Sequence, residues 1–172
     1  MKNELELSFL QVTSSFEKKT KDYIIKEYIK HYDKRISKSQ YIKLYEKMGE
    51  LIKNKKENAF FIALTEKEEI IGAISISLYD NRIINLQKRY DKKNIAEIGR
   101  CYIQEEFRRK GIASKLLQLC NIFASEKKYE KMYLHTHYFL PGGFPFWKEM
   151  GFKIILDEKN SLQTVHMEKS LT

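Results

Sequence analysis

Cysteine and proline are scarce in this sequence, with two residues of each among 172, and glycine occurs seven times. Cys101 and Cys120 are too few for a disulfide framework, and their spacing fits no zinc-binding pattern. So few prolines and glycines exclude collagen-like repeats and long flexible linkers. The longest apolar run is too short to span a membrane. Free thiols and the lack of a secretory signal at the start predict a soluble, cytoplasmic protein.

Charge is abundant and unequal in sign. The sequence has 32 Lys and Arg against 23 Asp and Glu, which gives a net charge of +9. Such a balance invites a nucleic-acid-binding interpretation, which would require strongly salt-dependent affinity for DNA or RNA. The positive charges are mostly Lys and are spread along the whole chain. We therefore favour a basic surface that suits an anionic cofactor over a nucleic-acid partner.

Apolar periodicity predicts one domain over residues 1–172, since 42% hydrophobic residues suffice for a sizeable core. Strands are predicted at residues 5–9, 59–64, 70–78, 94–104, 131–136, 152–156 and 162–167. Helices are predicted at about residues 16–32, 39–53, 111–128 and 144–150. A mixed sheet with helices on its faces, of class α/β (α+β), is the expected fold.

Local signals mark the ends of two helices and one long connection. Ser14 and Glu17 have the spacing of a capping box for the first helix. Gly151 is expected to end the last helix in a left-handed conformation. The polar stretch from Asp80 to Lys93 is long for a connection, so it is either functional or simply solvated.

The most informative stretch is a strand, a tight turn and a helix at residues 103–113. The start of a helix presents unpaired backbone N–H groups and a positive dipole end. Gly111 and Ala113 leave room for a bulky anion, and Arg108, Arg109 and Lys110 add full charges. The pattern predicts a pyrophosphate site. The glycine spacing of a P-loop or of a dinucleotide-binding turn is absent.

Residues 108–113 also resemble the acetyl-CoA signature Arg/Gln-x-x-Gly-x-Gly/Ala of the GNAT family of N-acetyltransferases. Residues 96–103 are similar to the fourth strand of that family, and residues 146–152 to its Leu-Tyr-Glu-Lys-x-Gly-Phe ending. The three blocks come in the order and at the distances of the family. The resemblance implies a GNAT-like mixed, mostly antiparallel, twisted sheet of about seven strands with helices on both faces.

The resemblance also implies a cofactor site for acetyl-CoA as cosubstrate, without a metal. Backbone amides of residues 109–114 would hold the pyrophosphate, and the fourth strand would pair with the pantetheine arm. The family splays its fourth and fifth strands around the acetyl group, and Gly99 could mark the bulge that opens this gap. The cofactor-binding residues implied are Cys101, Tyr102, Ile103, Arg108, Arg109, Lys110, Gly111, Ile112, Ala113 and Ser114.

Direct attack of an amine on the thioester needs a base for the ammonium proton and a donor for the oxyanion. Glu97 is the candidate base, because several family members carry a strand glutamate there and a half-buried carboxylate is more basic than one in water. The alternative is that Glu97 pairs with Arg100 or a loop lysine and only holds structure. The usual acid of the family, a Tyr in the last helix, is replaced by Trp147. Tyr138 is therefore the candidate acid, and the absence of any dedicated acid is the alternative.

Three further patterns have less specific interpretations. His135 and His137 could face one side of a strand as metal ligands, but no pattern supplies a third ligand, so packing or pocket lining is favoured. Direct transfer disfavours Cys101 as a covalent acetyl carrier. The aromatic stretch 141–147 either plugs the end of the sheet or forms one wall of the acceptor pocket.

The expected function is thus an N-acetyltransferase that acts on a primary amine of a small molecule or peptide. The alternative is a non-catalytic acetyl-CoA sensor or interaction module on the same fold. Two departures from the family motivate it: Trp147 replaces the usual Tyr, and the usual Asn is missing from the region of Leu140 and Gly143. A homodimer fits the family and no membrane partner is expected. The basic residues of segment 80–93 argue mildly against polyamine acceptors.

Overall fold

The computed structural model describes residues 5–171, which contain seven strands, five helices and three short 3-10 turns. The chain divides into two compact units, one with residues up to 75 and residues 100–120, the other with residues 76–99 and residues from 121 onward. Strands β3 (Ile70–Leu78) and β4 (Ile95–Ile103) and helix α4 (Ile112–Glu126) begin in one unit and end in the other. A single domain over residues 1–172 stays a prediction.

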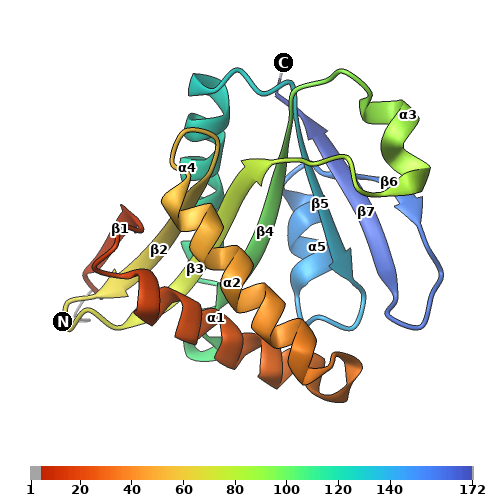
Figure 1. The fold of residues 1–172 in the computed structure, drawn as a ribbon. Coiled ribbons are helices and arrows are strands. Elements are labelled where there is room, and N and C mark those ends of the chain that lie inside the picture. Colours follow the sequence, from red (N-terminus) through yellow and green to blue (C-terminus); the bar gives the residue numbers. More distant parts are fainter. Residues whose placement is uncertain (1–4, 172) are drawn as a thin grey trace. The chain divides into compact units, whose positions relative to one another are not determined.

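The strands form one sheet in the order β1-β2-β3-β4-β5-β7-β6 (Figure 1). The other five strands are β1 (Leu7–Gln11), β2 (Ala59–Thr65), β5 (Lys131–His137), β6 (Lys153–Asp157) and β7 (Thr164–Ser170). The β4–β5 pair is parallel, whereas β1–β2, β5–β7 and β6–β7 are antiparallel. This mixed, mostly antiparallel sheet of seven strands confirms the expected fold.

In the first unit, helices α1 (Glu17–Tyr32) and α2 (Lys38–Lys53) bury one face of β2. Phe60, Ile62 and Leu64 alternate along that strand and pack into a core with Ile24 of α1 and Met48 of α2. Figure 1 shows α1 and α2 in front of β2 and β3, and α4 behind them. The turn η1 (Asp33–Arg35) separates the two front helices.

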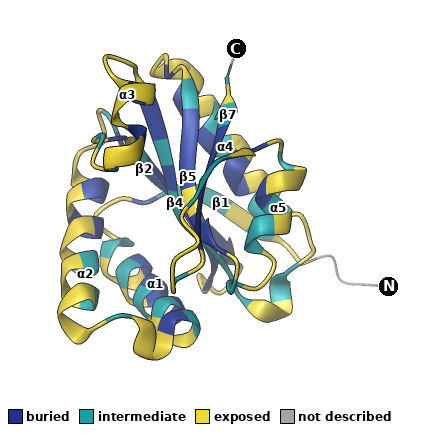
Figure 2. Ribbon diagram, turned by 90° about the vertical axis from the view of Figure 1, so that its right-hand side faces the viewer, coloured by how far each residue is buried: buried dark blue, intermediate teal, exposed yellow. Residues whose placement is uncertain are grey.

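In the second unit, the predicted polar connection is partly folded. It contains the turn η2 (Ile84–Leu86) and the short helix α3 (Gln87–Tyr90). Leu86 and Tyr90 are buried in a cluster with Tyr79, Ile95 and Tyr133. Figure 2 shows the buried stretches of the central strands in dark blue, while the polar parts of the segment around α3 are exposed. Side chains in this connection therefore have defined positions.

Helix ends differ in part from the prediction. The predicted capping box at Ser14 is wrong, because α1 begins at Glu17 and its N-cap residue Phe16 offers no side-chain bond. The capping box belongs to α2, where Ser37 Oγ accepts from the backbone N–H of Gln40 at 3.3 Å and Gln40 Oε1 accepts from the N–H of Ser37 at 2.6 Å. Gly151, at φ 90°, ends α5 (Gly143–Glu149) as predicted.

No helix within residues 5–171 is both long and apolar enough to cross a membrane.

Candidate functional site

The predicted anion site lies where β4 ends and α4 begins, inside one compact unit. The turn η3 (Glu105–Phe107) follows β4, and then Arg109 and Gly111 adopt left-handed φ angles of 59° and 77°. The first backbone bond of the helix runs from the N–H of Lys115 to the carbonyl of Gly111, at 3.1 Å. The N–H groups of the first helical turn have no acceptor within the helix, so they present donors to an anion.

The space and charge around this turn fit a phosphate group. A Cβ atom added to Gly111 would meet nothing within 4 Å, so the backbone is open to close approach. Arg109 and Lys110 are exposed, whereas Arg108 is tied to the protein. Its Nε donates to the carbonyl of Ile103 at 3.2 Å, and its Nη2 lies 3.5 Å from Nε2 of His31. Arg109 and Lys110 are therefore the exposed cations of the turn.

Between the same two hydrogen-bonded positions, β4 contains one residue more than β3. The carbonyl of Ile95 accepts from the N–H of Tyr79, and the N–H of Gln104 donates to the carbonyl of Ile71, both at 2.9 Å. Nine steps along β4 thus match eight along β3, which identifies a β-bulge. Arg100 has a φ of 49° and marks its position, next to the glycine that the sequence analysis indicated.

The backbone carbonyls of two of the three implied cofactor-binding residues of β4 accept hydrogen bonds from side chains of the protein. The carbonyl of Tyr102 accepts from the Tyr23 hydroxyl at 3.0 Å, and that of Ile103 accepts from Arg108. Burial raises the pKa of the Cys101 thiol to about 12, so it stays protonated at neutral pH. A neutral thiol is a poor nucleophile, which agrees with direct transfer over a covalent carrier at Cys101.

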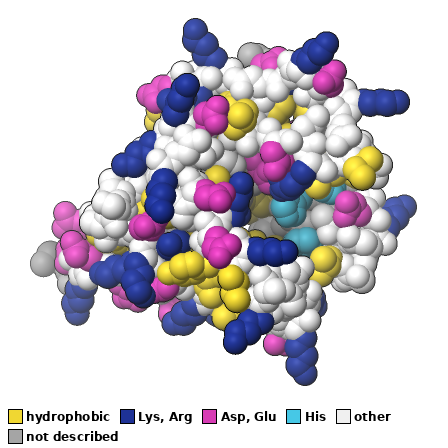
Figure 3. All heavy atoms as spheres, in the orientation of Figure 1, with side chains coloured by type: hydrophobic (Ala, Val, Ile, Leu, Met, Phe, Trp, Pro, Cys, Tyr) yellow, Lys and Arg dark blue, Asp and Glu magenta, His cyan; other side chains and the backbone are white. Residues whose placement is uncertain are grey.

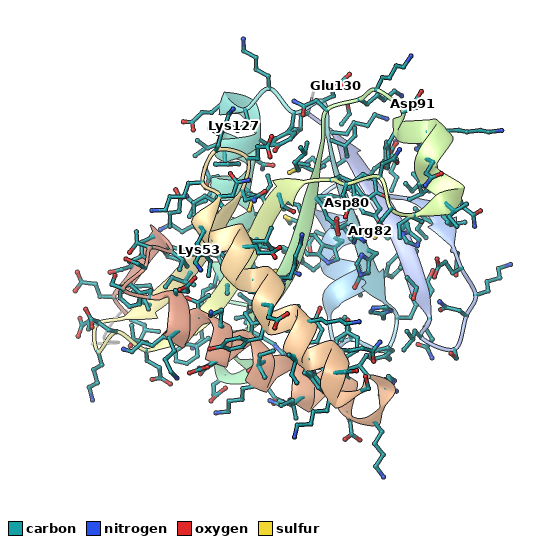
Figure 4. All side chains as sticks on the ribbon, viewed as in Figure 1. Lys53, Asp80, Arg82, Asp91, Lys127 and Glu130 are labelled. Atoms are coloured by element: carbon teal, nitrogen blue, oxygen red, sulfur yellow. The ribbon has the colours of Figure 1, made fainter. Side chains whose placement is uncertain are left out.

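Glu97 lies where β4 stops pairing with β5. The described pairing covers residues 95–97 of β4 and residues 131–133 of β5, although β5 continues to His137. The Glu97 carboxylate, 12% exposed, binds Arg82 in a bidentate pair with both N···O distances at 2.6 Å. Arg82 also bonds Asp80 at 3.0 Å, and Figure 4 shows these two side chains together on the segment after β3.

The partner of Glu97 is thus a loop arginine, neither Arg100 nor a lysine. Sequence reasoning placed Arg82 in a basic loop but did not assign its contact. The apolar residues Leu86 and Tyr90 could have indicated this contact, because their burial brings the loop back onto the sheet. His31 was missed as well, since nothing in the sequence connects α1 with Arg108.

The histidines of β5 and β7 lie side by side. The ring centroids of His135 and His137 are 5.8 Å apart, and those of His135 and His166 are 6.1 Å apart. Figure 3 shows histidine side chains grouped on one face, where Lys and Arg are interspersed with Asp and Glu. Partial desolvation lowers the pKa of His135 from its usual value, so this ring, 3.9 Å from Glu97 and 38% exposed, is neutral at neutral pH. Within residues 5–171, no group of three or more His, Cys, Asp or Glu side chains is arranged so that it could hold a metal ion.

The candidate acid lies on the surface. Tyr138 is 41% exposed and donates to Oδ2 of Asp157 at 2.9 Å. Burial and the Asp157 carboxylate raise its pKa, which disfavours the phenolate. Trp147 is 6% exposed and packs edge-on against Phe146 and Phe152, so this residue belongs to the core.

The stretch 141–147 contributes to a surface cavity of about 420 Å³ between α5, β6 and β7. Its lining is Phe144, Lys148, Gly151, Phe152, Lys153, Ile154 and Met167. Neither of the candidate catalytic side chains, Glu97 and Tyr138, lines it. Of the aromatic residues in stretch 141–147, the lining contains Phe144 but neither Phe146 nor Trp147. An aromatic wall of the acceptor pocket therefore stays a prediction.

Several solved structures with this fold are acetyltransferases. A GNAT-family acetyltransferase from Staphylococcus aureus Mu50 matches with a TM-score of 0.76 at 16% identity, over 97% of this chain and 100% of that one. The PaiA N-acetyltransferase from Thermoplasma acidophilum in complex with coenzyme A matches with a TM-score of 0.72 at 19% identity, over 96% and 99%. Aminoglycoside 6′-acetyltransferase type Ii matches with a TM-score of 0.67 at 15% identity, over 96% and 97%.

A comparison with curated proteins gives no significant match. The sequence profile of the acetyltransferase (GNAT) family matches residues 21–152. That span includes the predicted anion-binding turn, the bulged strand and the aromatic stretch. The chain therefore belongs to the GNAT family of acetyltransferases.

Proposed function

We propose that this chain transfers the acetyl group of acetyl-CoA to an amine by direct attack. The observation that carries the proposal is the turn at residues 108–114, which combines open space over Gly111, a helix N-terminus and two exposed cations. The family uses acetyl-CoA, and a related structure contains coenzyme A. The acceptor would be a primary amine of a small molecule or peptide.

The cofactor-binding residues would have two different tasks. Backbone N–H groups of Gly111, Ile112, Ala113 and Ser114 would hold the pyrophosphate, with Arg109 and Lys110 as counter-charges. Cys101, Tyr102 and Ile103 would lie along the pantetheine arm. Arg108 would stabilise the turn without contacting the phosphate, because its guanidinium bonds the carbonyl of Ile103 instead of facing solvent.

When bound, acetyl-CoA would supply an activated acetyl thioester. In this chain, the bulge at Arg100 frees backbone groups from the β3–β4 ladder, and an N–H there would donate to the oxyanion that develops on the attacked carbonyl. Glu97 would take the proton from the acceptor ammonium, directly or through water. Both of its oxygens bond Arg82, so the proton would go to a remaining lone pair or replace one of these two bonds. Tyr138 would protonate the leaving thiolate.

The second candidate function is a non-catalytic acetyl-CoA-binding module. Two observations favour it: Glu97 is fully engaged by Arg82, and Trp147 is a core residue. Turnover separates the two functions, because a sensor binds acetyl-CoA without releasing free thiol in the presence of any amine. Homodimerisation and a cytoplasmic location stay predictions.

Calorimetric titration with acetyl-CoA tests the cofactor site. We expect micromolar binding by the wild type and none by Gly111→Asp, because the carboxylate would project into the open space and repel phosphate. Gly111→Ala is the matched control for backbone strain, since it imposes a similar φ penalty without the charge. Failure of the folded wild type to bind would refute the proposal.

An amine library with free-thiol detection tests the base. If Glu97 is the base, Glu97→Gln lowers kcat by about 10²–10⁴-fold. Arg82→Gln frees the carboxylate and should retain turnover. If the pair only holds structure, both variants lose stability and activity alike, because each leaves a partner unpaired. That second pattern would refute the role of Glu97 as the base.

A further inference from the structure

A buried polar chain joins α1 to the turn that begins α4. Nε2 of His31 lies 3.5 Å from Nη2 of Arg108 and 3.3 Å from Oε2 of Glu27. The side chains of His31 and Glu27 are 10% and 8% exposed. All three residues belong to the same compact unit. The chain continues from Arg108 to the carbonyl of Ile103, at the end of β4.

One proton decides which neighbour His31 Nε2 can bond. When the neutral ring carries its proton on Nδ1, Nε2 accepts from the guanidinium of Arg108. A second proton, on Nε2, makes the ring an imidazolium, and Nε2 then donates to a carboxylate. Oε2 of Glu27 is buried and has no hydrogen-bond partner among the described residues, so an acceptor is available. Protonation also places an imidazolium beside the guanidinium, and like charges repel.

We propose that His31 is a positioning residue for the cofactor turn, whose neutral ring holds Arg108 and whose protonation releases Arg108 and weakens acetyl-CoA binding. The inference rests on the proposed cofactor site at residues 108–114. It gives α1 a direct influence on the affinity of that site. It also makes cofactor affinity depend on pH through a residue of α1, outside the cofactor turn.

The groups around His31 set the pH range. Glu27 and Lys30 come from α1, Arg108 from the turn, and the ring of Tyr102 stacks on His31 from β4 at 5.9 Å. Desolvation lowers the pKa of His31 from 6.5; Glu27 opposes the shift, while Arg108 and Lys30 add to it. The ring is therefore neutral at neutral pH and gains its proton only below pH 6.5.

Calorimetric titration with acetyl-CoA between about pH 8 and about pH 5 tests the inference on wild type, His31→Gln and Lys30→Gln. The 3′-phosphate of the cofactor titrates near pH 6, so the readout is the wild-type affinity relative to His31→Gln. We expect this ratio to fall about fivefold on acidification, the scale of one hydrogen bond. Lys30→Gln keeps His31 and removes an exposed pair with Glu105 at 3.4 Å, so it should retain the acid-dependent loss of affinity. Because Lys30 lowers the pKa of His31, that loss should move to slightly higher pH in this variant.

The pH at which acetyl-CoA affinity is lost should move in a predictable direction when a neighbour of His31 is changed. Because Glu27 raises the pKa of His31, Glu27→Gln should move the loss of affinity to lower pH. A purely structural role would lower affinity equally at every pH. Parallel curves for wild type and His31→Gln would overturn the inference while leaving cofactor binding intact. Absence of acetyl-CoA binding by the folded wild type at every pH would overturn the proposed function, and the inference with it.

If the variants do not fold, an NMR titration of the wild type tests the same inference. Linkage is reciprocal, so a cofactor that binds the neutral form better must lower the pKa of His31. The imidazole signals of His31 are followed against pH with and without acetyl-CoA. A lowered pKa in the complex supports the proposal, and an unchanged pKa overturns it.

Discussion

Replacing Glu168 on β7 should reveal how firmly the segment around α3 is held. Arg89 reaches both carboxylate oxygens, with Nε at 3.0 Å from Oε2 and Nη2 at 2.5 Å from Oε1. The Tyr90 hydroxyl donates at 2.6 Å and the ammonium of Lys131 at 2.9 Å. Glu168 is only 9% exposed, so its charge is stabilised by these partners instead of by water. The variant Glu168→Gln keeps the shape and removes the charge.

The magnitude follows from the carboxyl pKa. Burial raises the pKa of Glu168, but hydrogen bonds from Arg89, Tyr90 and Lys131 outweigh burial and lower it from 4.5 to about 2. At about 1.4 kcal/mol per pKa unit, the ionised form stabilises the folded state by about 3 kcal/mol. A lowered carboxyl pKa means that this stability is present above pH 4.5 and is lost as the pH falls towards about 2.

Urea denaturation as a function of pH measures this effect. We expect Glu168→Gln to lower the free energy of unfolding by about 2–3 kcal/mol at neutral pH, with the difference from wild type shrinking below pH 4.5. Glu50→Gln is the matched control, because its pair with Lys47 is exposed and should matter by less than about 0.5 kcal/mol. A cost for Glu168→Gln below about 1 kcal/mol, or one that does not change with pH, would refute the reasoning.

Two further substitutions test packing and capping by thermal melting. Gly72→Val should destabilise the protein by about 1–3 kcal/mol, since a Cβ at Gly72 would lie 2.8 Å from Cδ1 of Ile103 and 3.1 Å from Cγ2 of Ile112; an unchanged Tm would contradict this packing. Ser37→Ala should cost about 1 kcal/mol by removing the cap of α2, whereas Ser14→Ala should cost less than about 0.5 kcal/mol. The reverse order would favour the cap predicted from the sequence.

Regular elements were predictable because their apolar patterns are long enough to show a period. Strands β2 and β3 and helix α2 came within one or two residues of the observed bounds. The failures lie where a signal is short or recurs. Helix α3 has four residues, too few for a helical period, and its two buried side chains read as isolated apolar residues in a polar loop. The pattern of Ser followed by Glu or Gln three residues later occurs at Ser8, Ser14 and Ser37, and only Ser37 coincides with a helix start.

The candidate site divides in the same way between local and long-range features. The turn at residues 108–114 was predictable because consecutive residues make it: a glycine at positive φ, the start of a helix and adjacent cations. The bonds that orient it were not, because Arg108 meets a histidine 77 positions away, and Glu97 meets an arginine 15 positions away. Family motifs report the residues that face the cofactor, which recur at fixed spacing. Family motifs do not identify the partners that orient those residues on the side away from the cofactor. Any helix, strand or loop that packs against that side can supply such a partner. Chemistry that depends on such partners, including the ionisation of His31 and the availability of Glu97, therefore requires the folded chain.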